Sequence, residues 1–305
     1  MSGLDFTAMR RVRVKHQSIY PSYFLIPALL LYSALFILPS LLGFGFSLTN
    51  WNSYSTKISY IGFENFKEIF SVAGRSLSFL ANTLKFAAVT TILKVGIGLM
   101  LALAVNHKLK TKSILRTVFY LPVVLSPLVI GLVFTSIFHP VYGLLNRMLS
   151  SAGLEGLTRQ WLTDISTAMG AVMSVEVWRL SGYCMVIFLA GLQVIPNMYY
   201  EAAEIDGANA IQKFMRITLP FLKPAFTVNI ILNIIRGLKV FDIIFVLTRG
   251  GPGYATGVMN TAVFYEFSAG RYGFATALGV VIFLITTVVA FAVLGVLNRN
   301  EEALA

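Results

Sequence analysis

Cysteine and histidine are scarce in this 305-residue chain, and each scarcity excludes a kind of site. Cys184 is the only cysteine, so an internal disulfide and a cysteine-based metal cluster are both excluded. The three histidines, His16, His107 and His139, do not show the H-E-x-x-H spacing of a zinc site. We therefore expect no metal site and no cofactor bound by this chain.

Charge is scarce as well. Only 12% of the residues are charged, whereas about 25% is usual for a soluble domain. Hydrophobic residues make up 57% of the chain, and its mean hydropathy is +0.77. The net charge of +11 fits basic loops that face anionic lipid, because Lys and Arg accumulate on the cytoplasmic side of membrane proteins. The predicted loops contain no basic patch interleaved with aromatic residues, so the sequence does not indicate a nucleic-acid partner. The composition predicts a protein of the lipid bilayer.

Six apolar segments reach the length of about 20 residues that a membrane-spanning helix needs. The predicted fold is therefore an all-α membrane protein with six transmembrane helices. Residues 1–22 form an N-terminal segment, residues 23–297 the six-span domain and residues 298–305 a tail. The first span is too long for a signal-peptide core and has no small-residue cleavage site, so we expect it to remain as an anchor. The predicted spans are Tyr23–Leu48, Leu77–Val105, Thr117–Phe138, Ile165–Gln193, Pro224–Thr248 and Phe274–Leu297.

The distribution of Lys and Arg between the predicted loops gives the orientation. One side carries twelve of these residues and the other carries seven. The side with twelve includes both termini, with an N-terminal group and a second-loop group that agree. The positive-inside rule then predicts that both termini are cytoplasmic, together with the loop 196–220 between spans four and five. The two groups are Arg10, Arg11, Arg13 and Lys15, and Lys108, Lys110, Lys112 and Arg116.

Several polar residues fall inside the predicted spans, where a central charge costs roughly 2.5–3.5 kcal/mol. Lys94 is a cation inside span two. In spans four and five the polar residues recur at helical spacing and define faces. One interpretation is a hydrated path for a hydroxyl-rich solute, with an aromatic ring to stack on a sugar. The other is a set of polar contacts with a neighbouring subunit. The candidate path residues are Glu176, Arg179, Tyr183, Asn229, Asn233, Arg236 and Lys239.

A polar stretch, EAAEIDGANAIQKFMRITLP, separates spans four and five at residues 201–220. Asn197 is a suitable N-cap for a helix that Gly207 would stop. A second short helix is expected from Asn209 to about Thr218, ending before Pro220. The first helix either packs on the chain's own spans or lies in a groove of a partner, and helix spacing leaves both open.

The same stretch carries a fixed pattern: Glu-Ala-Ala, then a glycine after three residues, then Ile-x-Leu-Pro after nine more. It is formed by Glu201, Ala202, Ala203, Gly207, Ile217, Leu219 and Pro220. This pattern resembles the signature loop of permease subunits of binding-protein-dependent ABC importers. Most of the chain, including IGFENFKEIF (61–70) and FDIIFVLTRGGPGYAT (241–256), resembles the carbohydrate-importing, maltose-permease type. The resemblance implies the type I ABC importer permease fold, with the helix that starts the pattern as the coupling helix.

The resemblance also implies partners. These are a second permease subunit in a heterodimer, a dimer of ABC ATPases, an extracytoplasmic solute-binding protein and a sugar, in the cell membrane of a prokaryote. ATP and magnesium would be used by the ATPase, since this chain has no G-x-x-x-x-G-K-[ST] phosphate loop and is not expected to be an enzyme. Only one span precedes the core, and the first external loop is short. This departure from the maltose-permease type argues against a large external docking domain.

Three alternatives concern the solute and the mechanism. The basic excess in spans four and five leaves an anionic sugar or a glycerol-phosphate-like solute open. An ion-coupled secondary transporter would be expected to show an inverted repeat with broken helices, which is not evident. A membrane enzyme would need paired carboxylates, a histidine cluster or a nucleophile motif near a membrane face, and the sequence has none of these.

Overall fold

The computed structural model describes residues 22–71, 75–106 and 111–302. The predicted N-terminal cations, the loop cations Lys108 and Lys110, and the last residues of the tail lie outside this range. The described residues fall into two compact units divided between Gly45 and Phe46. The first unit is an apolar helical stretch, and its helices α1 and η2 contain no buried residue. It consists of η1 (Ser22–Phe24), α1 (Leu25–Tyr32), η2 (Ser33–Ile37) and most of α2 (Leu38–Phe46).

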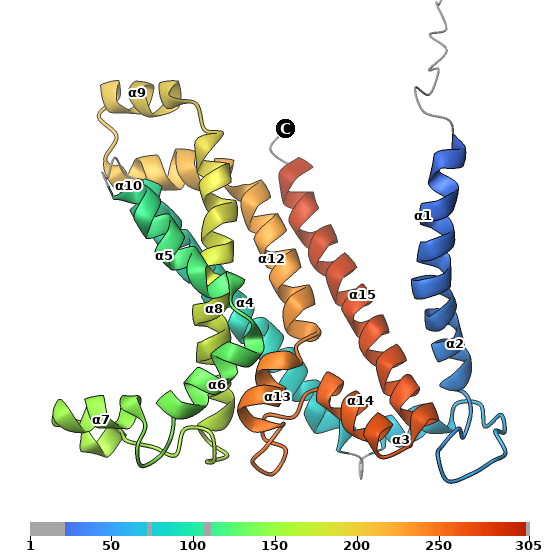
Figure 1. Cartoon of the computed structure of the whole chain (residues 1–305). Coiled ribbons are helices and arrows are strands. Elements are labelled where there is room, and N and C mark those ends of the chain that lie inside the picture. The colour runs from blue at the N-terminus through green and yellow to red at the C-terminus, as the bar shows by residue number, and fades with distance from the viewer. Residues whose placement is uncertain (1–21, 72–74, 107–110, 303–305) are drawn as a thin grey trace, which may run out of the picture. The chain divides into compact units, whose positions relative to one another are not determined.

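The second unit is also helical, and in its described residues the only strand-like feature is an isolated bridge between Thr49 and Tyr60. The all-α prediction is therefore confirmed (Figure 1). Its elements are α3 (Glu64–Phe70), α4 (Ser76–Asn106), α5 (Lys112–Val124), α6 (Pro127–Ile137), α7 (Leu144–Ser151), η3 (Glu155–Leu157), α8 (Ala168–Gln193), α9 (Asn197–Ile205), α10 (Ala210–Lys213), η4 (Phe214–Thr218), α11 (Leu219–Phe221), α12 (Lys223–Leu238), α13 (Asp242–Thr248), α14 (Met259–Ser268) and α15 (Tyr272–Glu302).

Four stretches are long and apolar enough to cross a membrane as single helices. These are Leu25–Phe46, Ser76–Asn106, Ala168–Val194 and Tyr272–Leu297, which match four of the predicted spans. Two bent pairs raise the number to as many as six by length and composition: α5 with α6, and Ala210–Phe221 with α12.

The predicted third and fifth spans are each divided into two helices, so the count of six single transmembrane helices is not exact. α5 and α6 meet at an angle of 96°. Residues before a proline avoid the helical conformation, and Ser126, which precedes Pro127, is extended and caps Leu128 N. In the fifth span, α12 ends at Leu238 and a separate short helix, α13, begins at Asp242.

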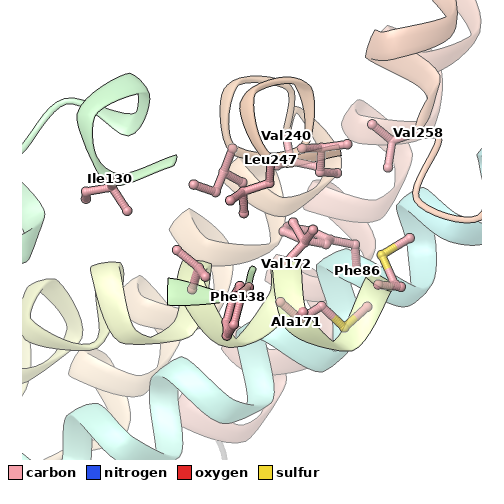
Figure 2. Packing of buried hydrophobic residues seen from close by; sticks show 13 residues of the cluster. Phe86, Ile130, Phe138, Ala171, Val172, Val240, Leu247 and Val258 are labelled. Carbon is pink, nitrogen blue, oxygen red and sulfur yellow. The ribbon is translucent and has the colours of Figure 1, made fainter. Parts of the chain in front are cut away.

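Three hydrophobic clusters hold the helices together. The first joins α4, α6, α8 and α13 through residues such as Phe86, Ile130, Val172 and Leu247, and Figure 2 shows these side chains from close by. The second joins α4, α8 and the start of α12. The third joins α3, α14 and α15.

Glycines set the closest helix contacts. Side chains would collide with neighbouring residues at Gly98 of α4, which lies against Cys184 of α8, and at Gly237 of α12, which lies against Ala87 of α4. A side chain at Gly182 of α8 would collide with the backbone of α5 at Phe119. Small residues at such crossings let membrane helices approach closely, and this close approach is a main source of helix association in lipid.

Replacing Gly182 with alanine should lower the stability of the protein. The added methyl group meets backbone that cannot rotate away, so we expect a loss of about 1–3 kcal/mol, typical of overpacking. Thermal unfolding of the purified protein in detergent would measure the loss. Gly170→Ala is the matched control on the same helix, because nothing lies within 4 Å of its added methyl group and alanine favours a helix. Equal unfolding temperatures for the two variants would contradict the contact.

Candidate functional site

The loop between α8 and α12 begins with α9, which lies at the end of the second unit opposite α3, α13 and α14 (Figure 1). The predicted helix and its stop are confirmed, since α9 ends at Ile205 and Gly207 has the left-handed φ of +74°. The predicted cap was wrong. Pro196 is the extended N-cap residue, and Asn197 is the first residue of the helix.

The second part of the loop starts as predicted and ends differently. Asn209 caps α10 through reciprocal hydrogen bonds: Gln212 N donates to Asn209 Oδ1 (2.9 Å), and Asn209 N donates to Gln212 Oε1 (2.8 Å). The helix was expected to end before Pro220, yet η4 and α11 continue through it. η4 is a π-helical turn, whose wider winding leaves room for the proline ring that would collide with an α-helical turn.

Two contacts tie the halves of the loop together. The hydroxyl groups of Tyr200 and Thr218 lie 2.9 Å apart. Lys213 Nζ donates to Glu204 Oε1 at 2.8 Å, and this hydrogen bond and charge hold the pKa of Glu204 below its ordinary value. Tyr200 and Ile217 also pack against the cluster of α4, α8 and α12. Through these contacts the loop is fixed to the end of the bundle formed by α4, α8 and α12.

The signature residues divide between an outer and an inner position. Glu201, Ala202, Gly207 and Pro220 are exposed, whereas Ala203, Ile217 and Leu219 are partly buried.

Large apolar side chains nevertheless remain on the outside of this loop. Met198 and Ile205 of α9 have 67% and 87% of their surface exposed, and α9 buries no residue. Ile211 and Met215 are exposed as well, and we name these four residues the loop surface. The alternative in which α9 packs its apolar side on the chain's own spans does not match this arrangement.

The candidate path residues on α8 form a connected group. Glu176, Arg179 and Tyr183 follow one face at spacings of three and four. Glu176 Oε2 accepts hydrogen bonds from Arg179 Nε (3.1 Å) and Nη2 (2.8 Å). The Arg236 guanidinium of α12 lies over the Tyr183 ring, 4.1 Å from its centre. The structure thus joins both helices in a group that we name the arginine cluster: Glu176, Arg179, Tyr183 and Arg236.

The predicted polar stripe on α12 is divided. Asn229 and Asn233 are fully buried, and Asn233 Nδ2 reaches Asn229 O (2.9 Å) and Cys184 Sγ (3.1 Å). Arg236 and Lys239 are exposed, and Lys239 is the residue that follows the end of α12. The asparagines therefore face the interior of the bundle.

Polar residues of α4 are buried as well, and together with the two asparagines we name them the buried layer. Lys94, Thr90 and Thr91 are almost completely buried. Six buried polar atoms of this layer have no hydrogen-bond partner among the described residues: Thr90 Oγ1, Thr91 Oγ1, Lys94 Nζ, Asn229 Nδ2 and Oδ1, and Asn233 Oδ1. Lys94 lies within electrostatic range of Glu176, Arg179 and Arg236. The sequence showed Lys94 as a charge inside a span, but spacing within one helix did not reveal its neighbours on two others.

A cavity of about 800 Å³, which the sequence did not predict, lies at the end opposite α9. Arg75 donates to the Tyr254 hydroxyl (2.7 Å) and stacks over the Tyr254 ring. Arg271 pairs with Glu68 (2.6 Å) and Glu266 (3.2 Å). Tyr254, which lines the cavity, has a φ of +68°, a conformation that is uncommon for residues other than glycine.

Comparison with known proteins gives a consistent result. The family model described as "Binding-protein-dependent transport system inner membrane component" matches residues 94–301. The chain is 36% identical to "Probable ABC transporter permease protein YurN" of Bacillus subtilis, covering 95% of this chain and 99% of that one. It is 34% identical to "Multiple sugar-binding transport system permease protein MsmF" of Streptococcus mutans, covering 88% and 91%. It resembles a solved "bacterial alginate ABC transporter in complex with alginate pentasaccharide-bound periplasmic protein", with a TM-score of 0.76, 25% identity and coverage of 91% and 92%.

Replacing Lys213 with methionine should loosen α9. The pair with Glu204 contributes at neutral pH, and its contribution disappears as the pH falls through the lowered pKa of Glu204. Amide hydrogen exchange of residues 197–205 should therefore become a few-fold faster in Lys213→Met at pH 7, and the difference should vanish in acid. Lys223→Met is the matched control. Unchanged exchange in Lys213→Met at pH 7 would show that the pair does not hold α9.

Proposed function

This multi-pass membrane chain belongs to the family of binding-protein-dependent transport system inner membrane components, and from that premise we propose that it is the permease subunit of an ATP-driven importer of a carbohydrate. The similarity to MsmF, which is named as a permease of a multiple sugar-binding transport system, covers 88% of this chain and supports a carbohydrate as the solute. The solved importer bound to a saccharide-loaded periplasmic protein supports a solute-binding protein as the donor of the solute.

The observation that carries the proposal is α9, an exposed helix held at one end of the bundle. An apolar surface outside the spans calls for a partner, because exposed apolar patches mark interaction sites. We assign that partner as an ABC ATPase, with Met198 and Ile205 seated in a groove of its surface. The small residues Ala202 and Ala203 would let the helix backbone lie close to the groove.

Movement of α9 has a physical route into the spans. Tyr200 and Ile217 pack against the cluster that joins α4, α8 and α12, so a displaced loop pushes on the helices that carry the arginine cluster. ATP binding shifts the transporter only if the ATPase binds nucleotide more tightly in one conformation than in the other. Closure of two ATPase subunits would then draw two such loops together and open the path to the opposite side.

The remaining partners follow from the exposed surfaces. Arg236 and Lys239 lie on an exposed part of the bundle, which a second, similar permease would cover to complete the solute path between the two chains. The binding protein would dock at the end opposite α9. We propose that α9 and both termini are cytoplasmic, that the complex lies in the cell membrane of a prokaryote, and that ATP and magnesium are bound by the ATPase.

Charge reversal in α9 should uncouple transport. In proteoliposomes that contain the complete importer, we expect Glu201→Lys to lower ATP-dependent uptake of the transported saccharide by at least about tenfold, the effect of losing about 1.4 kcal/mol of coupling. Gly207→Asp should act similarly, since Gly207 has a left-handed φ that suits glycine best and the substitution adds a negative charge to the loop. Uptake of a labelled sugar panel, with ATP hydrolysis measured in parallel, tests both variants.

Glu155→Lys provides the control, because Glu155 is exposed in the connection between α7 and α8, at the other end of the bundle. Membrane insertion, judged by yield in the membrane fraction, should be normal in all three variants. Normal uptake by Glu201→Lys and Gly207→Asp would contradict the assignment of α9. Uptake of no saccharide by the unmodified complex would contradict the proposed function itself.

A further inference from the structure

The arginine cluster carries more positive than negative charge. Within it, Glu176 is the only acid, and its Oε2 accepts both hydrogen bonds from Arg179. Arg236 stacks on Tyr183 and has no ion pair among the described residues. The group therefore contains two guanidinium groups and one carboxylate, with one guanidinium paired to the carboxylate and the other stacked on Tyr183.

Lys94 of α4 adds a third basic side chain to this part of the bundle. Its side chain is fully buried, and its ammonium group has no hydrogen-bond partner in the described part of the chain. It lies within electrostatic range of Glu176, Arg179 and Arg236, so three basic side chains and one acidic side chain are grouped here. Lys239 and Asp242, three residues apart at the end of α12, have opposite charges and leave this excess unchanged.

This imbalance is unfavourable in a membrane. Like charges repel strongly where the effective dielectric constant is low, and unpaired cations in a span are costly. Glu176 cannot balance the group alone, because Lys94 and Arg179 both draw on it. A guanidinium group with free N–H donors matches the paired oxygens of a carboxylate, sulfonate or phosphate. An anion beside Tyr183 would bring the group close to neutrality.

We propose that the solute carried past this cluster is an anionic saccharide, whose acidic group binds Arg179 and Arg236 next to Tyr183. This inference rests on the proposed function and specifies the class of its solute. Arg236 binds the acidic group directly. Lys94 is a positioning residue: it lies within electrostatic range of Glu176 and competes with Arg179 for that carboxylate, which leaves the N–H groups of Arg179 that Glu176 does not use free for the solute.

Direct binding to the permease tests the proposal without the selectivity of the binding protein. The complex of this chain with its second permease and ATPase, in nanodiscs, is titrated with two labelled probes of the same ring size, D-glucuronate and D-glucose. We expect glucuronate to bind at least about tenfold more tightly, the effect of one charge-assisted contact. Added salt should weaken the binding of glucuronate alone, because the contact is electrostatic.

Variants assign the preference to residues. Arg236→Gln should reduce the preference for glucuronate to about twofold or less, whereas Arg147→Gln, which removes an exposed cation of α7, should leave it unchanged. Lys94→Met should weaken glucuronate binding and leave glucose binding unchanged. If that variant does not assemble, the double variant Lys94→Met, Glu176→Gln retains the net charge of the cluster and should recover assembly together with the preference.

Equal binding of the two probes, or no binding of either probe, would overturn the proposal. A preference for glucuronate that persists in Arg236→Gln would overturn it as well. Loss of glucose and glucuronate binding in equal measure in Lys94→Met would assign that residue to packing instead. ATP-dependent uptake of a neutral saccharide by the same complex would leave the proposed function intact while removing the anionic class. The two failures are therefore distinguishable.

Discussion

The close contact of α4 with α8 and α12 is the constraint on which the rest of the second unit depends. It is set by Gly98 and Gly237, where any side chain would collide with the neighbouring helix. Each of these three helices also carries a buried polar side chain, such as Lys94 of α4, Glu176 of α8 and Asn233 of α12. The lysine is tolerated because Glu176 lies within its electrostatic range. The same packing therefore stabilises the bundle and concentrates charge at one level of it.

The charged residues lie on the same helices that contact the loop with α9, so the proposed coupling site and the proposed solute site are connected. The loop with α9 rests on the cluster formed by α4, α8 and α12, and these helices also carry Lys94 and the arginine cluster. Packed interiors transmit displacement because they have little free volume. A small shift at Tyr200 or Ile217 therefore reaches the charged group through side chains that are already in contact, without a dedicated pathway of residues.

Features within one segment could be predicted from the sequence, and features between segments could not. The end of α9 at Gly207 and the cap at Asn209 depend on neighbouring residues alone. The bend before Pro127 is also local, because a residue that precedes proline avoids the helical conformation. The spacing of Asn229, Asn233 and Arg236 predicted a shared face of α12, but not that neighbouring helices bury the first two and leave the third exposed. The neighbours of Lys94 come from helices more than 80 residues further along the chain, which no spacing rule can identify.

The exposed apolar residues of α9 have a consequence for biogenesis. A helix that exposes Met198 and Ile205 to water is prone to non-specific association until a partner protein covers these side chains. A subunit inserted in excess of its partner would display this surface to the chaperones and proteases that recognise incompletely assembled proteins. The helix that would pass motion into the membrane would thereby also mark the subunits that lack their partner. Degradation of these unassembled subunits would match the numbers of the two subunits in the cell.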